Sequence, residues 1–123
     1  MLYSWLLSWL LVVSVLCLVY AFTVYWLVFW RGPWATAYNP LVAWVLRRMR
    51  QQAITIGART YLSLPNVGLS DAGEKHERFH FTDQWKRWPL TFVPRYLYQL
   101  MRYGYDRMPL ENTARAAAGE PTR

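Results

Sequence analysis

The chain has 123 residues, a net charge of +7 and a single cysteine, Cys17. This length allows one unit, and one cysteine excludes a disulfide scaffold. The basic charge suits anionic lipid headgroups or nucleic acid, but no nucleic-acid-binding motif accompanies it, so we expect no nucleic acid among the partners.

Residues 1–30 carry no charged side chain and predict a transmembrane helix. About 20 apolar residues are enough to cross a bilayer. Trp and Tyr residues cluster near both ends of the stretch and are absent from its middle, which places the span at about residues 4–28. No basic segment precedes the run, and it is about twice as long as a signal-peptide core. We therefore expect a retained anchor and not a cleaved signal peptide.

Charge predicts the orientation of this helix. Five arginines follow the span before the first acidic residue, Asp71, and no charged side chain precedes it. Positively charged flanks stay on the cytoplasmic side of a membrane, or on the matrix side in a mitochondrion. The C-terminal part is expected there.

The span contains no ionisable side chain of the kind that forms proton or ion paths, so transport is not expected. Its small residues allow close approach of a neighbouring helix, although serines are also tolerated in a lipid-facing helix. The candidate helix-packing residues are Ser4, Ser8, Ser14, Cys17 and Ala21.

A basic amphipathic helix is predicted over residues 40–56, with Asn39 as its N-cap and Gly57 as its C-cap. Its apolar side holds Val42, Val45, Leu46, Met49, Ala53 and Ile56. This side faces either lipid or a partner subunit. The candidate lipid-binding residues are Arg31, Arg47, Arg48 and Arg50, with anionic phospholipid, cardiolipin included, as the ligand.

Short helices are expected further along. Asp71 and Glu74 suit a capping box for a helix that reaches about Trp88, and Pro94 opens another that ends before Gly104. The predicted fold is an all-α membrane protein with an extended arm and no independent globular core. Its parts are a transmembrane helix (1–31), a juxtamembrane helix (32–57), the arm (58–110) and a polar tail (111–123).

One motif raises the question of catalysis. His76-Glu77-x-x-His80 matches the zinc-peptidase pattern, in which two histidines one helical turn apart bind Zn²⁺ and the glutamate acts as general base. In that case His76 and His80 would be the metal ligands and Glu77 the base.

A third ligand is missing from the expected places. Asp83 and Lys86 stand where a metzincin extension has Gly and His, and Glu111 follows the motif by about thirty residues instead of about twenty. The sequence therefore predicts no enzyme, no cofactor and no metal, with histidines that are solvated or face a partner. A catalytic zinc site and a non-catalytic metal contact remain alternatives.

The layout of one span, a basic amphipathic stretch and a long arm resembles the single-span supernumerary subunits of mitochondrial respiratory complexes and ATP synthases. The resemblance concerns architecture and transfers no residues. It implies a non-catalytic accessory subunit that stabilises a bioenergetic complex of the mitochondrial inner membrane, with electron transport favoured over ATP synthesis. Its partners would be the other subunits and anionic lipid, and its C-terminal side would lie in the matrix. The alternatives are a small membrane zinc metallopeptidase and a bacterial inner-membrane assembly or regulatory protein.

Overall fold

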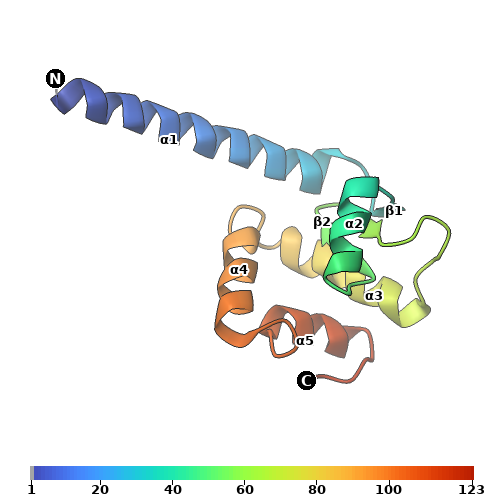
Figure 1. The fold of residues 1–123 in the computed structure, drawn as a ribbon. Coiled ribbons are helices and arrows are strands. Elements are labelled where there is room, and N and C mark those ends of the chain that lie inside the picture. Colours follow the sequence, from blue (N-terminus) through green and yellow to red (C-terminus); the bar gives the residue numbers. More distant parts are fainter. Residues whose placement is uncertain (1) are drawn as a thin grey trace.

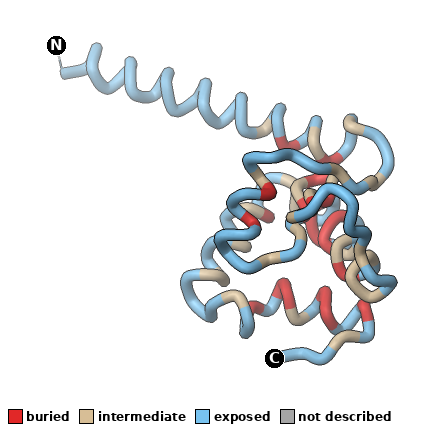
Figure 2. Tube along the Cα trace, turned by 45° about the vertical axis from the view of Figure 1, so that its right-hand side comes forward, coloured by how far each residue is buried: buried red, intermediate tan, exposed pale blue. Residues whose placement is uncertain are grey.

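The computed structural model describes residues 2–123, and its longest element is an N-terminal helix that projects away from the other elements (Figure 1). Helix α1, Leu2–Tyr25, continues into a π-helical segment, η1, Trp26–Trp30. Met1, the first residue of the predicted membrane segment, lies outside the described residues. By length and composition, Leu2–Trp30 is a helix that could cross a membrane, and its outer part is exposed almost throughout (Figure 2).

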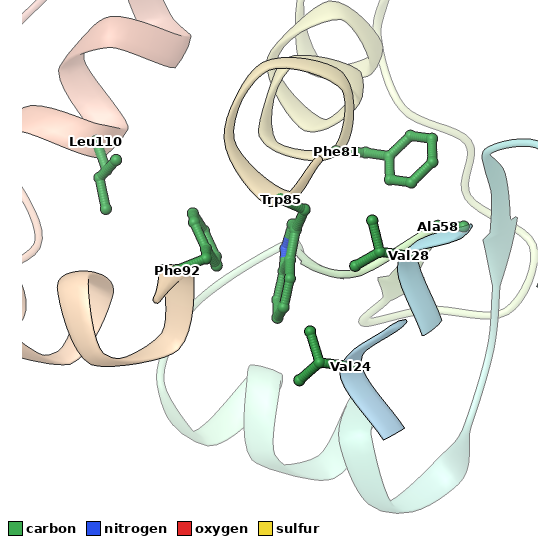
Figure 3. Close-up of a cluster of buried hydrophobic side chains, with 7 residues drawn as sticks. All are labelled: Val24, Val28, Ala58, Phe81, Trp85, Phe92 and Leu110. Atoms are coloured by element: carbon green, nitrogen blue, oxygen red, sulfur yellow. The ribbon is translucent and has the colours of Figure 1, made fainter. Parts of the chain in front are cut away.

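The end of this helix belongs to the hydrophobic core. Val24 is 4% exposed and Val28 is 1% exposed. Both valines point toward the indole of Trp85, which has Phe92 on its other side (Figure 3). Residues 2–23 are left outside the core, and their roughly 33 Å of helix matches the ~30 Å hydrocarbon thickness of a bilayer.

A small mixed sheet contradicts the all-α prediction. It contains β1, Ala35–Ala37, β2, Ala53–Ile56, and β3, Arg59–Leu62, in the order β1-β3-β2. Strand β1 is parallel to β3, and β2 forms an antiparallel hairpin with it. The helical spacing of Ala53 and Ile56 predicts a helix here, but the β-branched run Ile54-Thr55-Ile56 favours the strand that the structure has.

The amphipathic helix is therefore shorter than predicted. Helix α2, Pro40–Arg48, begins as expected, because the Asn39 side chain accepts hydrogen bonds from the N–H groups of Leu41 and Val42. It stops eight residues early. Arg50 has a left-handed backbone (φ 57°), and the N–H of Gln51 bonds back to the carbonyl of Leu46 at 2.9 Å. Such a left-handed residue closes a helix even where no glycine is present.

Gly57 is the turn of the hairpin and not a helix cap. Its φ is +59°, and a Cβ at this position would lie 2.5 Å from the backbone oxygen of Leu27. The next N–H, of Ala58, donates to that same oxygen at 2.9 Å. Glycine is needed here because it allows positive φ and the close approach of another backbone. The hairpin is thereby joined directly to the end of the apolar helix.

The remaining helices are α3, Asp71–Phe79, the π-helical η2, His80–Trp85, α4, Phe92–Tyr103, and α5, Pro109–Ala117. Ser70 caps α3 by accepting from the N–H of Gly73, so the cap lies one residue before the predicted Asp71. Helix α4 ends before Gly104, as predicted. Trp85, Phe92 and Leu110 come from different elements and share one buried cluster, so the expectation of no globular core is also wrong.

Candidate metal centre

Two buried histidines face the same way from adjoining helical segments. His76 lies in α3 and His80 begins η2, with their rings 4.9 Å apart. They are 7% and 4% exposed. The spacing of four residues places both on one face, as the sequence indicates. Burial means that neither is a solvated side chain.

Glu111 completes a group of three. Its Oε2 lies 2.8 Å from Nε2 of His76 and 3.2 Å from Nε2 of His80. All three candidate ligand atoms lie within 4.8 Å of one another, and Glu111 is 3% exposed. A carboxylate thus stands where the sequence motif lacked a third ligand.

Helix α5 is anchored so that Glu111 points inward. Pro109 stands in the first turn, where its missing N–H costs nothing. The next residue, Leu110, is held from both sides. Its N–H donates to Oε1 of Gln99, and its carbonyl accepts from Nε2 of Gln84, each at 2.8 Å. Two neighbouring helical segments therefore fix the backbone one residue before the carboxylate.

Tyr96 selects which oxygen of Glu111 faces the histidines. Its hydroxyl donates to Oε1 at 2.9 Å, which leaves Oε2 for the two imidazoles. Burial and the Glu111 charge raise the pKa of Tyr96 far above its usual range, and they raise the pKa of Tyr105 to about 12. Both phenols therefore stay protonated at neutral pH.

The outer nitrogens of the two histidines differ in their contacts. Gln84 donates through Nε2 to Leu110, so its Oε1 must accept from Nδ1–H of His80, at 2.6 Å. Nδ1 of His76 lies 3.3 Å from a carboxylate oxygen of Glu120, but the two atoms form no hydrogen bond. A partner such as Gln84 orients a metal-binding histidine and places the lone pair on its inner nitrogen.

Electrostatics join the carboxylate to the two histidines. Burial opposes the charged form of Glu111, but hydrogen bonds from His76 and His80 outweigh it and hold the pKa of the carboxyl far below its usual range. Burial likewise opposes charging of His80, and the bond to Glu111 leads the contacts that raise its pKa above the ordinary value. A histidine that donates to Glu111 carries a proton on Nε2, and a metal ion held by the three groups would take the place of such protons.

The donor set fits Zn²⁺. Two nitrogens and one carboxylate oxygen form the three-ligand pattern of catalytic zinc sites, which keep a fourth position open. Tetrahedral ligands at ~2.0–2.1 Å stand roughly 3.3 Å apart, close to the two separations from Glu111. Small movements of side chains already in place would accommodate the ion.

Glu77 lies beside this group and faces a groove. It lines the same cavity as His80 and Glu111 and is half-buried. Its Oε2 accepts a 2.5 Å hydrogen bond from the Thr55 hydroxyl. A carboxylate in this position can take a proton from a water at the open metal position.

A directed series of hydrogen bonds ends at Glu77. The Trp34 indole N–H can only donate, and it bonds the Thr60 hydroxyl at 3.0 Å. The Thr60 and Thr55 hydroxyls are 2.7 Å apart, and Thr55 gives its own proton to Glu77. Thr60 must then donate to Thr55. The sheet thus supplies a fixed donor that orients the Glu77 carboxylate.

The predicted lipid-binding arginines lie apart from this group. Arg31 donates to the Tyr61 hydroxyl and sits over the Trp26 ring, while Arg47 donates to the Ser63 carbonyl. Arg48 lies over the Trp44 ring, and Arg50 is exposed. The predicted helix-packing residues lie along the outer part of α1: Ser4, Ser8, Ser14 and Cys17 are exposed and Ala21 is half-buried.

Sequence reasoning missed the residues that complete the centre. Glu111 was assigned to a polar tail, and Gln84, Tyr96 and Glu120 were not singled out. One signal was present, because Pro109 followed by Leu110-Glu111 is typical of a helix start. No protein-family model, curated protein or solved structure matches this chain.

Proposed function

We propose that the chain is a membrane-anchored zinc hydrolase that cleaves peptide bonds. The observation that carries the proposal is the position of Glu111 Oε2, 2.8 and 3.2 Å from the inner nitrogens of His76 and His80. It supplies the third ligand to a motif whose central glutamate already faces an open groove. The burial of both histidines and the hydrogen bond that orients His80 through Gln84 add support.

The residues divide into three roles. His76, His80 and Glu111 would hold Zn²⁺, which supplies Lewis acidity toward a carbonyl oxygen and toward water. Glu77 takes a proton from the attacking water as the water oxygen joins the carbonyl carbon. It then gives that proton to the amide nitrogen as the C–N bond breaks, so that a carboxylic acid and an amine result.

The N-terminal helix would anchor this centre in a membrane. Residues 2–19 are exposed and mostly apolar, and their roughly 27 Å of helix is close to the ~30 Å hydrocarbon thickness of a bilayer. The arginines after the helix favour a catalytic part on the cytoplasmic or matrix side. The accessory-subunit hypothesis from the sequence stays a prediction, tested by migration with a large complex on a native gel.

The decisive experiment compares Glu77→Gln with the full-length wild type in detergent or nanodiscs. The wild type is expected to bind one zinc ion and to hydrolyse an unfolded, fluorescence-quenched protein. Loss of a general base costs about 10²–10⁴-fold in rate. Glu77→Gln should therefore keep its zinc and lose hydrolysis by at least about 100-fold.

The matched control is Glu74→Gln, one turn earlier on the same helix, where the carboxylate pairs with Arg78 at the surface. It should keep both zinc and activity. A wild type that binds no zinc after metal loading, or a Glu77→Gln variant as active as Glu74→Gln, would overturn the proposed function.

A further inference from the structure

The groove beside the candidate metal centre is apolar along most of its length. It has a volume of about 770 Å³, within the usual range for ligand sites. Its lining includes Glu77, His80 and Glu111. Its apolar side chains come mainly from two helices, with Leu41 and Val45 on α2, Met49 directly after it, and Val93, Leu97 and Leu100 on α4. Whatever occupies this groove meets apolar side chains from both helices together with candidate metal ligands.

The apolar stripe of helix α2 lies at the groove. Its apolar stripe was expected to face lipid or a partner subunit. Val42, Val45, Leu46 and Met49 instead line the same cavity as the metal ligands. The stripe is thus placed to select an occupant by its side chains.

The charge of the lining excludes an anionic occupant. No lysine or arginine lines the groove, although the chain carries 14 of them. The acidic groups that line it are Glu77 and Glu111, of which Glu111 is a candidate metal ligand. Phosphates and nucleic acids need cations at the site that holds them. The occupant is therefore neutral and apolar over the length of the walls.

The floor of the groove suits a polypeptide. All four residues of β2 line it, and β2 is an edge strand that pairs only with β3 in the three-stranded sheet. The carbonyl of Thr55 already accepts from the Trp85 indole N–H at 3.1 Å. An extended chain would therefore pair with the edge before Thr55, whose backbone N–H and C=O groups an acyl chain cannot use.

The groove also lies near the point where the chain meets the membrane helix. The Tyr20 hydroxyl donates to the carbonyl of Leu90 at 2.8 Å, two residues before α4 begins. One wall thus starts at the apolar helix. Segments that are apolar and extended are the kind that membrane proteins expose when they are unfolded or displaced from lipid.

We infer that the substrate is an extended polypeptide segment with apolar side chains near the bond to be cleaved, bound between α2 and α4. This inference rests on the proposed function, because it assigns the substrate of that centre. It adds that Val45 and Leu97 determine specificity, one from each wall.

Binding is measured with zinc-loaded full-length Glu77→Gln in nanodiscs, so that cleavage does not intervene. The probes are a fluorescent ten-residue peptide of Leu, Val and Phe and a matched peptide in which these are replaced by Ser and Gln. The apolar peptide should bind at least about 10-fold more tightly, as expected for burial of one or more large apolar side chains. Adding Leu97→Gln or Val45→Gln should weaken it about 10-fold.

Met101→Gln on α4 and Trp44→Gln on α2 are the matched controls. Both side chains are exposed, at 87% and 51%, and neither lines the groove. Partition of the peptide into lipid is the same for every variant and cancels. These controls should leave binding unchanged, and retained zinc shows that each variant is folded.

Equal binding of the two peptides, or equal effects of Leu97→Gln and Met101→Gln, would overturn the inference. So would displacement of the peptide by lysophosphatidylcholine, which would assign the groove to lipid. The proposed function fails separately. If the wild type cleaves nothing while groove variants still alter binding, the groove assignment stands and the hydrolase does not. If the wild type cleaves apolar and polar peptides equally, the hydrolase stands and the groove assignment does not.

Discussion

The outer part of helix α1 and the His76–His80–Glu111 group differ in polarity and exposure: the first is apolar and exposed, the second polar and buried. Leu11 and Leu16 on α1 are apolar and 66% and 62% exposed, whereas the three polar side chains of the centre are at most 7% exposed. Water disfavours both arrangements, since exposed apolar surface and buried charge each cost free energy. Under the proposed function, each would become favourable with one partner that is not polypeptide: lipid for the helix and a metal ion for the centre. The comparison teaches that both proposals can be tested by the same question, namely whether surroundings outside the chain stabilise each region.

The largest expected effect comes from removing a metal ligand. Glu111→Gln keeps the shape of the side chain but removes the charge at which two imidazole nitrogens converge. Loss of an outer partner of a metal ligand already costs 10–100-fold in affinity, so loss of this ligand should cost more than about 100-fold. Competition with a chromophoric zinc chelator measures the change.

Asp106→Asn is the control, because Asp106 is an exposed acid that pairs with Arg123. It should leave zinc affinity unchanged. If Glu111→Gln binds zinc as the wild type does, Glu111 is not a metal ligand. The burial of the three groups would then not be explained by a metal ion.

The next effect tests the other half. Val13 lies mid-way along the exposed part of α1, 49% exposed. An arginine at the centre of a membrane helix costs ~2.5–3.5 kcal/mol of insertion free energy, so Val13→Arg should lower the inserted-to-free ratio roughly 100-fold. Alkaline extraction of membranes followed by quantification of the pellet checks this.

Met101→Arg is the matched control, since Met101 is also apolar and exposed but lies on α4, outside the candidate membrane helix. It should remain fully membrane-bound. Equal extraction of the two variants would mean that the exposed apolar surface of α1 does not face lipid.

These two regions also differ in how far the sequence predicts them. The membrane candidate rests on composition over thirty neighbouring residues, and the Asn39 cap and the Gly104 stop rest on one or two residues each, so sequence reasoning identified them. The centre joins residues more than thirty positions apart, and its third ligand depends on how α5 packs through Gln84 and Gln99. Tertiary contacts of that kind leave no local pattern.

The hairpin was missed for a different reason. Ala53 and Ile56 fit a helical stripe and a strand equally well, and short apolar runs do not distinguish the two. Helix α2 ends because Arg50 adopts a left-handed conformation. Arginine rarely does so, and no sequence pattern predicts it. The strand then pairs with β3 and brings Thr55 to Glu77.

The joint between the two regions provides the third prediction. In Gly57→Ala, the new Cβ would meet the Leu27 backbone at 2.5 Å while the residue keeps a positive φ. The expected cost is about 2–3 kcal/mol of unfolding free energy, or a fall in Tm of roughly 10 °C or more. Thermal unfolding of the purified protein in detergent measures it.

Gly119→Ala separates the two causes, since Gly119 has φ +75° at the end of α5 but nothing within 4 Å of an added Cβ. It should cost only about 1–2 kcal/mol, the penalty for the left-handed conformation. If both variants lose the same stability, contact between the hairpin and the apolar helix does not hold the two regions together.

The smallest expected effect concerns the orientation of Glu77. It distinguishes zinc binding, which should not change, from the catalytic rate, which should. Thr55→Val removes the donor to the Glu77 carboxylate while the volume changes little. Loss of one hydrogen bond to a charged group is worth about 1.5 kcal/mol, so kcat should fall roughly 10-fold with KM and zinc content unchanged. Thr55→Ser should restore the rate, because it restores the hydroxyl.

Thr60→Val is the control for packing. It perturbs the same buried place but leaves Thr55 free to donate to Glu77, and its effect on the rate should therefore be smaller. A rate that falls equally in Thr55→Val and Thr60→Val would make the threonines packing residues only, and the sheet would then have no part in positioning the base.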